Sequence, residues 1–600
     1  MADFVCALSE IFNFIYTWIS CAIIALIPRT WRLKDVSNEI VLITGGASGF
    51  GRELALKFSE LGSKIVIWDI NEKFLQETQK MIEERGNKCY SFVCDVTDRN
   101  DVYAKAETVK KEVGNVTILV NNAGVVDSKS LLNLNDDFVE RTFKVNILSH
   151  IWTCKAFLPS MINANKGHIV SIASVLGLQG TSKLDDYCAT KSAAIMLMEA
   201  LYYELNFAGH CNIKLTTVCP YQMDTGMFAG VNSKKVPPLD PKATAQQTVN
   251  AIRADEDFVI FPSYFKLCYL LKPFLPMKCL FMLMKFLEAD AVIDKFVVAM
   301  NIGDIIVGFF LALFYWLRSI VLFFVPRKLR LKDVSKETVL ITGGGGGFGR
   351  LLAIKFGQLG SKVVVWDIDD NALQQTKHLV KKFGGECHVY VCDVTNRKEV
   401  YKVADKVKHE VGNVTILVNN AGIVSGKPFF EIDDNMIEKT YQVNVLAHYW
   451  TCKAFLPSMI EAKHGHIVSI ASVSGLNAVP HLTDYSASKF AAVGFQESLS
   501  LETYFNGHRD INFTTICPYF MNTGMFDGAN CDVFAMLEPE YCADQTMSAI
   551  LSNQEFVVLP RFFYLTYALK TLLPWKAYLC CIRGFNFQKL MHTFKGKKQN

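Results

Sequence analysis

The chain has 600 residues, of which 50% are apolar and only 20% are charged, with a net charge of +4. This composition is too apolar for a disordered chain, and the length exceeds what one hydrophobic core usually organises, so we expect several folded domains. The small net charge, without a Lys/Arg tract interleaved with aromatic residues, argues against a nucleic-acid partner. The 18 cysteines form no C-x-x-C pair and no His/Cys cluster at zinc spacing, so we expect neither a metal site nor a disulfide framework.

The first segment in chain order, residues 1–35, is predicted to be a membrane anchor. Residues 11–27 carry no charge and are followed by Arg29, Arg32 and Lys34. As a helix they would span about 26 Å, which is marginal against a hydrocarbon core of about 30 Å. No positive charge precedes the apolar run and no small-residue cleavage site follows it, so we interpret it as an uncleaved anchor and not as a signal peptide.

The rest of the sequence is present twice. VLITGGASGFGR at 41–52 returns as VLITGGGGGFGR at 339–350, and NVTILVNNAG begins at both 115 and 413. The offset is 298 residues in both cases (339 − 41 and 413 − 115). A period of this size indicates a duplicated whole domain and not a solenoid of small repeats. We therefore divide the chain into a first unit (36–298), a second apolar anchor with linker (299–332) and a second unit (333–600).

Each unit alternates short β-branched runs with helical stretches. In the first unit EIVLITG, SKIVIWDI and KCYSFVCDV are separated by segments with helical periodicity. This alternation predicts βαβ units and a parallel sheet covered by helices on both faces. The predicted fold class is α/β, with one doubly wound (Rossmann) domain in each unit.

A glycine-rich loop follows the first predicted strand of each unit and leads into a helix. Glycines allow a tight turn that brings backbone N–H groups and the helix N-terminus against a pyrophosphate. Glycine clusters more often mark plain turns, but the strand before, the helix after and an acid at the end of the next strand favour a dinucleotide site. The loop residues predicted to bind the cofactor are Thr44, Gly45, Ser48, Gly49, Phe50 and Gly51 in the first unit, and Thr342, Gly343, Gly347, Phe348 and Gly349 in the second.

That acid is Asp69 in the first unit and Asp367 in the second. Each lies 24 residues after the first loop glycine, where a carboxylate accepts hydrogen bonds from the ribose hydroxyls. It would repel a 2′-phosphate, and no basic residue follows it within WDIN or WDID, so we expect NAD in preference to NADP. The alternative is a surface aspartate that opens a turn.

A tyrosine and a lysine lie four residues apart in a helical segment of each unit, as Tyr187 and Lys191 and as Tyr485 and Lys489. This spacing places both side chains on one helix face. An adjacent ammonium and a cationic nicotinamide both favour the phenolate, which could then accept a proton from an alcohol. Taken alone, the pair is typical of an ordinary surface helix; its combination with the glycine loop indicates a catalytic site.

A serine precedes each tyrosine by thirteen residues, Ser174 in the first unit and Ser472 in the second. It follows the apolar run HIVSIAS, which we predict to be a central strand. We expect its hydroxyl to hold the substrate oxygen while the tyrosine takes the proton.

The motifs T-G-x-x-x-G-x-G, N-N-A-G, S and Y-x-x-x-K, in this order and spacing, resemble the short-chain dehydrogenase/reductase family over nearly the whole chain, twice. The resemblance implies a relay asparagine that holds a water near the lysine, an N-N-A-G segment beside the cofactor, an aspartate at the adenine and a threonine at the nicotinamide carboxamide. One departure is Pro-Tyr, at 220–221 and 518–519, where the family often has Pro-Gly. The implied residues are Asn146, Asn122, Ala123, Gly124, Asp95 and Thr225 in the first unit, and Asn444, Asn420, Ala421, Gly422, Asp393 and Thr523 in the second.

A closer similarity, carried by WDIN, TCKAFLPSM, DYSASKFAAVGF and CPYFMNTGMF, is to epidermal-type retinol dehydrogenases and lipid-droplet 17-beta-hydroxysteroid dehydrogenases. It implies a lipophilic alcohol as substrate, with a retinoid favoured over a steroid or fatty alcohol, and the endoplasmic reticulum membrane or a lipid droplet as location. Those relatives are usually single units, so the duplication allows an intramolecular pseudo-dimer. A lipid-surface binding or scaffold protein with vestigial catalysis is the alternative class, which the two complete catalytic sets disfavour.

The sequence leaves two membrane topologies open. Residues 305–325 form a second apolar run with Arg318 near its middle, where a charge is costly in a simple span. Single crossings would place the two units on opposite sides, so a shallow hairpin or interfacial insertion is preferred, with both units facing the cytosol; an extra crossing elsewhere is the alternative. The apolar stretches that begin at 263 and 561 either cap each core or lie flat on the membrane.

Overall fold

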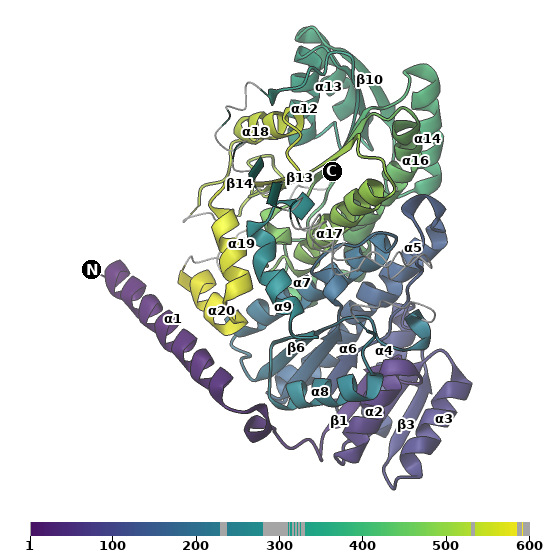
Figure 1. The fold of residues 1–600 in the computed structure, drawn as a ribbon, viewed down its shortest axis with the longest axis vertical. Coiled ribbons are helices and arrows are strands. Elements are labelled where there is room, and N and C mark those ends of the chain that lie inside the picture. Colours follow the sequence, from purple (N-terminus) through teal and green to yellow (C-terminus); the bar gives the residue numbers. More distant parts are fainter. Residues whose placement is uncertain are drawn as a thin grey trace.

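The computed structural model describes residues 2–228, 237–279, 331–529 and 534–584, with single positions between 310 and 330 and at 591 and 594. Within these residues each repeat folds into a seven-stranded parallel sheet with helices on both faces (Figure 1). The strand orders are β3-β2-β1-β4-β5-β6-β7 and β10-β9-β8-β11-β12-β13-β14. The prediction of two tandem doubly wound domains is confirmed.

The two units contain matching elements. The first has strands β1 (Ile40–Thr44), β2 (Lys64–Asp69), β3 (Cys89–Val93), β4 (Ile118–Asn121), β5 (Gly167–Ile172), β6 (Ile213–Pro220) and β7 (Phe258–Phe261), and helices α2 (Gly49–Glu60), α3 (Glu72–Glu83), α4 (Arg99–Glu112), α5 (Asp136–Phe143), α6 (Ser149–Asn163), α7 (Asp185–Phe207), α8 (Pro241–Arg253) and α9 (Phe265–Leu271). The second has strands β8 (Thr338–Thr342), β9 (Lys362–Asp367), β10 (Glu386–Val391), β11 (Ile416–Asn419), β12 (Gly465–Ile470), β13 (Ile511–Pro518) and β14 (Phe556–Leu559), and helices α12 (Gly347–Gln358), α13 (Asp370–Lys382), α14 (Arg397–Glu410), α15 (Asp434–Tyr441), α16 (Ala447–Glu461), α17 (Thr483–Phe505), α18 (Pro539–Leu551), α19 (Phe563–Leu572) and α20 (Trp575–Gly584).

The strand order reverses between β1 and β4, which places the ligand crevice of the first unit. These central strands are covered on both faces, so they read as continuous apolar runs, IVLIT and ILVN, whose side chains are almost all buried. Where the strand order of a parallel sheet reverses, the connections after the two neighbouring strands run in opposite directions. A crevice then opens at the carboxyl ends of those strands. The glycine loop, which follows β1, and the N-N-A-G segment, which follows β4, therefore meet at that crevice.

The two units are joined by the long helices α7 and α17, which pack against each other at the centre of the molecule (Figure 1). Nearly every residue of both helices is buried, because each helix covers its own sheet on one side and the other unit's helix on the other. The approach is close: a Cβ added at Gly494 would lie 2.5 Å from the Ser192 hydroxyl oxygen. Reciprocal contacts continue this interface outward, since Lys155 pairs with Asp434 and Lys453 pairs with Asp136.

The N-terminal helix α1 (Ala2–Leu26) runs along one side of the molecule and contacts α20 (Figure 1). Among the described residues it is the one helix, through Ser9–Leu26, long and apolar enough to cross a membrane. Its large apolar side chains are exposed, for example Phe12 at 69% and Leu26 at 85%. The second predicted anchor at 305–325 lies mostly outside the described residues.

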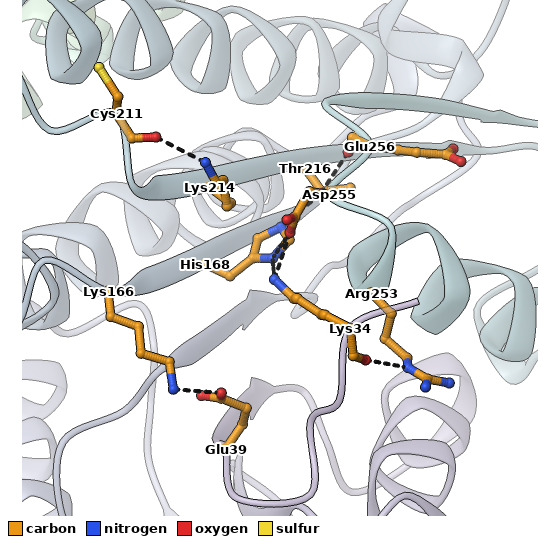
Figure 2. A network of polar contacts seen from close by, with 10 residues as sticks. All are labelled: Lys34, Glu39, Lys166, His168, Cys211, Lys214, Thr216, Arg253, Asp255 and Glu256. Carbon is orange, nitrogen blue, oxygen red and sulfur yellow. Dashed lines mark hydrogen bonds and ion pairs between the residues drawn. The ribbon is translucent and has the colours of Figure 1, made fainter. Parts of the chain in front are cut away.

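The chain that follows α1 is tied to the amino end of β5 and to the segment before β7, opposite the ligand crevice. Figure 2 shows Lys34, whose Nζ lies 2.6 Å from an Asp255 carboxylate oxygen and 3.1 Å from Nδ1 of His168. Arg253 Nε donates to the Lys34 carbonyl oxygen at 2.9 Å, and the Lys34 N–H donates to the Arg253 carbonyl at the same distance. Nearby, Arg29 forms a two-pronged ion pair with Glu256. The direction in which α1 leaves the first unit is therefore fixed by contacts on the far side of the sheet.

The apolar stretches near the end of each unit expose side chains at matching positions. Leu267 and Phe274, in and beside α9, are 60% and 56% exposed, and the matching Leu565 and Leu572 of the second unit are 54% and 55% exposed. The rest of α19 is mostly buried, with Phe563 inside the core. Within the described residues each stretch thus packs partly on its core and leaves some apolar side chains exposed.

Candidate active site

A cavity of about 820 Å³ opens at the carboxyl ends of the strands in the first unit. Its wall joins the glycine loop and the acid at the end of β2 to the serine, tyrosine and lysine beyond β5. A dinucleotide and a substrate alcohol can therefore share one continuous space. The sequence-predicted residues in its wall are Gly45, Ser48, Gly49, Phe50, Gly51, Asp69, Asp95, Asn122, Ala123, Gly124, Ser174, Tyr187, Lys191 and Thr225.

The glycine loop is closed by hydrogen bonds between β1 and β4. The Thr44 hydroxyl oxygen accepts from the N–H groups of Asn122 and Ala123 at 3.0 and 3.1 Å, and Asn122 Nδ2 donates to the Thr44 carbonyl at 2.9 Å. The turn is so tight that a Cβ added at Gly51 would lie 2.1 Å from the Gly45 carbonyl oxygen. Free N–H groups at the start of α2 thus face the cavity, which is the cradle that a pyrophosphate requires.

Two carboxylates of the cavity wall are held by backbone hydrogen bonds. Asp69 accepts from the N–H groups of Ala47 and Asn71 at 3.3 and 3.1 Å. Asp95 accepts from the N–H and hydroxyl of Thr97 at 2.9 and 2.8 Å. Because these bonds fix the carboxylates and both line the cavity, the two carboxylates can accept hydrogen bonds from a ligand there; their roles at the ribose and the base stay predictions.

The catalytic side chains are fixed at the other end of the cavity. Lys191 Nζ donates to the Ile172 carbonyl at 2.8 Å and lies 5.6 Å from the centre of the Tyr187 ring. The Ser174 hydroxyl bonds to Tyr187 and donates to the Pro220 carbonyl at 3.4 Å. Burial lowers the pKa of Lys191 to about 8 and raises the pKa of Tyr187, while the bond from Ser174 lowers the latter.

The tyrosine pKa in this geometry differs from the sequence-based expectation. We expected the ammonium to favour the phenolate, but the largest effect on Tyr187 is desolvation, which favours the neutral phenol. The lysine lies against the ring face with its Nζ bonded to a backbone carbonyl. Burial of Tyr187 therefore acts against formation of the phenolate.

Asn146 lies behind the cavity, in the π-helical turn Lys144–Leu148. Its Oδ1 accepts from the Val125 N–H at 2.8 Å, and its Nδ2 donates to the Val125 carbonyl and to the Thr190 hydroxyl at 3.0 and 3.1 Å. Thr190 was missed by the sequence analysis, although a hydroxyl residue directly before the lysine in both Y-x-x-x-K motifs was a usable signal. Asn146 thus bonds to the residue that directly precedes Lys191 in the chain.

The second unit repeats this geometry. Lys489 Nζ donates to the Ile470 carbonyl at 3.0 Å, and Asn444 Nδ2 donates to the Ser488 hydroxyl at 3.0 Å. Burial lowers the pKa of Lys489 to about 8 and raises that of Tyr485. The other predicted residues occupy the matching places around the loop, the acid, the adenine carboxylate and the serine: Thr342, Gly343, Gly347, Phe348, Gly349, Asp367, Asp393, Asn420, Ala421, Gly422, Ser472 and Thr523.

One wall of the second site differs. Phe520 stacks on Phe526 with ring centres 4.3 Å apart, and Phe526 meets Tyr485 edge-on at 5.9 Å. The position of Phe520 is taken in the first unit by Gln222, which lines the cavity. The two units therefore present different surfaces to a substrate.

The profile of the short chain dehydrogenase family matches residues 39–236 and, a second time, residues 337–533. The chain belongs to this family. It is 47% identical to cattle short-chain dehydrogenase/reductase family 16C member 6, in an alignment that covers 44% of this chain and 83% of the relative. It is 44% identical to human epidermal retinol dehydrogenase 2 over 48% of this chain and 94% of the relative, and 42% identical to mouse estradiol 17-beta-dehydrogenase 11 over 45% and 90%. Each relative thus corresponds to about one unit.

Family membership and the geometry give the reaction class. The tandem short chain dehydrogenase is an oxidoreductase that acts on alcohol groups, and its cofactor is a nicotinamide dinucleotide. The residues present fit that cofactor, because the loop is a phosphate cradle that a Cβ would fill and the cavity extends from it to Ser174 and Tyr187.

Proposed function

We propose that the protein is a membrane-associated dehydrogenase that exchanges a hydride between NAD(H) and a lipophilic alcohol or its carbonyl product, with retinol and retinal as the favoured pair. The observation that carries this proposal is the single cavity with Asp69 at one end and Ser174, Tyr187 and Lys191 at the other. Asp69 supports NAD, because a fixed carboxylate repels a 2′-phosphate. The relatives named for retinol support the substrate.

The side chains have distinct roles in this mechanism. The nicotinamide, when bound, accepts or supplies the hydride. Ser174 holds the alcohol oxygen and Tyr187 takes its proton. Lys191, whose pKa of about 8 leaves it cationic at neutral pH, stabilises the resulting phenolate from beneath the ring. Asn146 keeps the π-helical turn and the neighbouring Val125 backbone in place beside the lysine.

The membrane part of the proposal rests on the apolar surface. Helix α1 and the face of α9 that includes Leu267 expose large apolar side chains. Burying such surface in lipid is favourable, and a lipid-dissolved alcohol would enter from that side. We propose the endoplasmic reticulum membrane or a lipid droplet as the location, with both units facing the cytosol, and an intramolecular pseudo-dimer built on α7 and α17 as the functional form.

A hydroxysteroid is the second candidate substrate, supported by the similarity to estradiol 17-beta-dehydrogenase 11. The test is turnover by detergent-solubilised protein with NAD⁺ or NADP⁺ and, separately, all-trans-retinol, estradiol and a long-chain fatty alcohol. The proposal predicts the fastest turnover with NAD⁺ and retinol. Faster turnover of estradiol or the fatty alcohol would show that this alcohol, and not retinol, is the preferred substrate. No turnover with any combination of alcohol and cofactor would favour the lipid-surface scaffold protein.

A further inference from the structure

A short loop between the catalytic serine and the catalytic tyrosine forms part of each site. We call residues 176–184 and 474–482 the substrate loops of the first and second units. In the first unit Leu176, Thr181 and Leu184 of this loop line the same cavity as Ser174 and Tyr187. The position of the loop therefore sets the shape of the space in which an alcohol meets the catalytic tyrosine.

The first unit's substrate loop is held by α17, which belongs to the second unit. Lys272, in a short turn at residues 272–274, donates from Nζ to the Leu178 carbonyl at 2.7 Å and to a Glu497 carboxylate oxygen at 2.7 Å. Both charged side chains are largely removed from solvent, at 10% and 3% exposure. One lysine of the first unit thus connects its own substrate loop to a carboxylate of the other unit.

The second unit's substrate loop is held by the matching contacts. Lys570 donates to the Leu476 carbonyl at 2.7 Å and pairs at 2.6 Å with Glu199 of α7, at 4% and 0% side-chain exposure. Glu204, also on α7, accepts from the Thr483 hydroxyl at 2.8 Å at the end of this loop. The arrangement is therefore reciprocal and occurs twice in the molecule.

The first loop has further contacts with α17: Glu502 accepts from the Lys183 N–H at 3.0 Å, and Ser498 bonds to Thr181. The Thr181 N–H donates to the Ser498 hydroxyl oxygen at 3.1 Å, and that hydroxyl donates to the Thr181 carbonyl at 2.7 Å. The backbone there lies so close to α17 that a Cβ at Gly180 would be 2.7 Å from the Ser498 nitrogen. The second unit has Ala478 and Ala200 at the matching positions, so it cannot form this pair of side-chain bonds.

We propose that each unit positions the substrate loop of the other, with Glu497 acting through Lys272 on the first site and Glu199 acting through Lys570 on the second. Glu199 and Glu497 are positioning residues, since neither lines the first unit's cavity and each acts through a lysine. A buried lysine that loses its partner carboxylate is strongly disfavoured, so it would move toward water and release the loop. The proposal rests on the dehydrogenase function proposed above.

The test uses the full chain with one site silenced. In a Tyr485→Phe background, where only the first site works, we expect Glu497→Gln in the second unit to raise KM for the alcohol about tenfold, within the usual range of coupling between sites. The KM for NAD⁺ should stay unchanged, and Glu497→Asp should restore most of the affinity for the alcohol. The matched control is Glu199→Gln in the same background, which lies in the first unit but should leave its KM unchanged. In a Tyr187→Phe background, where only the second site works, Glu199→Gln should raise KM for the alcohol and Glu497→Gln should leave it unchanged.

Hydrogen exchange gives a readout that does not depend on turnover. Glu497→Gln should speed exchange in 176–184 and leave 474–482 unchanged, and Glu199→Gln should do the reverse. If each substitution affects only the unit that contains it, or affects both loops equally, the positioning proposal is wrong. If the loops respond as predicted but no alcohol is turned over, the positioning proposal stands and the proposed function fails.

Discussion

Burial governs the chemistry of the individual catalytic side chains. Tyr187 and Lys191 are 5% and 3% exposed, and desolvation raises the pKa of the phenol and lowers that of the ammonium to about 8. Each group is therefore biased toward its neutral form. Proton transfer from an alcohol to Tyr187 has to overcome this desolvation, and positive charge near the phenol oxygen would offset it.

At the cofactor end, the fixed carboxylates make a prediction about selectivity. Replacing Asp69 and Asp367 together by Ser removes the charge that would repel a 2′-phosphate. We expect the ratio of kcat/KM for NAD⁺ to that for NADP⁺ to fall at least about tenfold. The control is Asp98→Asn, which alters only the helix cap of α4. An unchanged ratio would show that these carboxylates do not select the cofactor.

Four buried histidines make a prediction about acid stability. Burial lowers the pKa of His150 and of His448 to about 3, and it lowers the pKa of His168 and His466 as well. The unfolded chain binds these protons near the ordinary value of about 6.5, so between pH 6.5 and 3 it holds more protons than the folded chain and stability falls as pH falls.

At pH 5 the lowered pKa values of His150 and His448, about 3, should each cost about 2 kcal/mol of stability relative to pH 7.5. Thermal unfolding should therefore shift steeply downward below pH 6.5, and His150→Gln with His448→Gln should reduce that shift. Gln can keep a bond to Ser171, which lies 3.2 Å from His150 Nδ1. The control His378→Gln lies on the exposed side of α13 and should not change the slope. Equal slopes in all variants would contradict this explanation.

At the scale of elements, the two units differ in the residue that begins the central helix and in its contact with the other unit's central helix. Asp185 begins α7 and lies with Glu502 of α17, and burial together with Glu502 raises the pKa of Asp185 well above its ordinary range. The second unit has Thr483 there, which donates a hydroxyl to Glu204. The first unit thus pairs two carboxylates where the second pairs a hydroxyl with a carboxylate.

Replacing Asp185 by Thr would give the first unit the residue that the second unit has at this position, with a hydroxyl in place of a carboxyl group beside Glu502. A carboxyl group with a raised pKa in the folded state contributes least to stability at high pH, because stability is lost as pH rises from the unfolded pKa through the folded one. We therefore expect Asp185→Thr to raise the unfolding temperature more at pH 8 than at pH 5.5. A larger gain at pH 5.5 would contradict the sign of this linkage.

Local pattern explains which elements were predictable. The glycine loop and the Tyr–Lys helix depend on residues near one another in sequence, so spacing placed Gly45 at a strand end and Tyr187 on one helix face with its lysine, whereas Asn122 was implied by the family resemblance. The contact between Lys272 and Glu497 joins residues 225 positions apart in different units. Its existence depends on how α7 packs on α17, and no short-range pattern encodes that. The raised pKa of Tyr187 was missed for the same reason, since burial is a property of the folded chain.

At the scale of the whole molecule, duplication has produced two sites with matching catalytic sets and different walls. Both units retain the serine, tyrosine, lysine and asparagine, and both lysines bond to the carbonyl at the end of the preceding strand. The first site has Gln222 where the second has Phe520 stacked on Phe526. We therefore propose that both units are working dehydrogenases, each with its own preference among lipophilic alcohols.

The most direct test of that claim is turnover of the preferred alcohol by wild type, Tyr187→Phe, Tyr485→Phe and the double variant. Loss of the general base should cost a site at least about a hundredfold in rate. We expect each single variant to retain the activity of its intact unit and the double variant to be silent. If one single variant is already silent while the other matches wild type, only one unit is catalytic and the central claim is wrong.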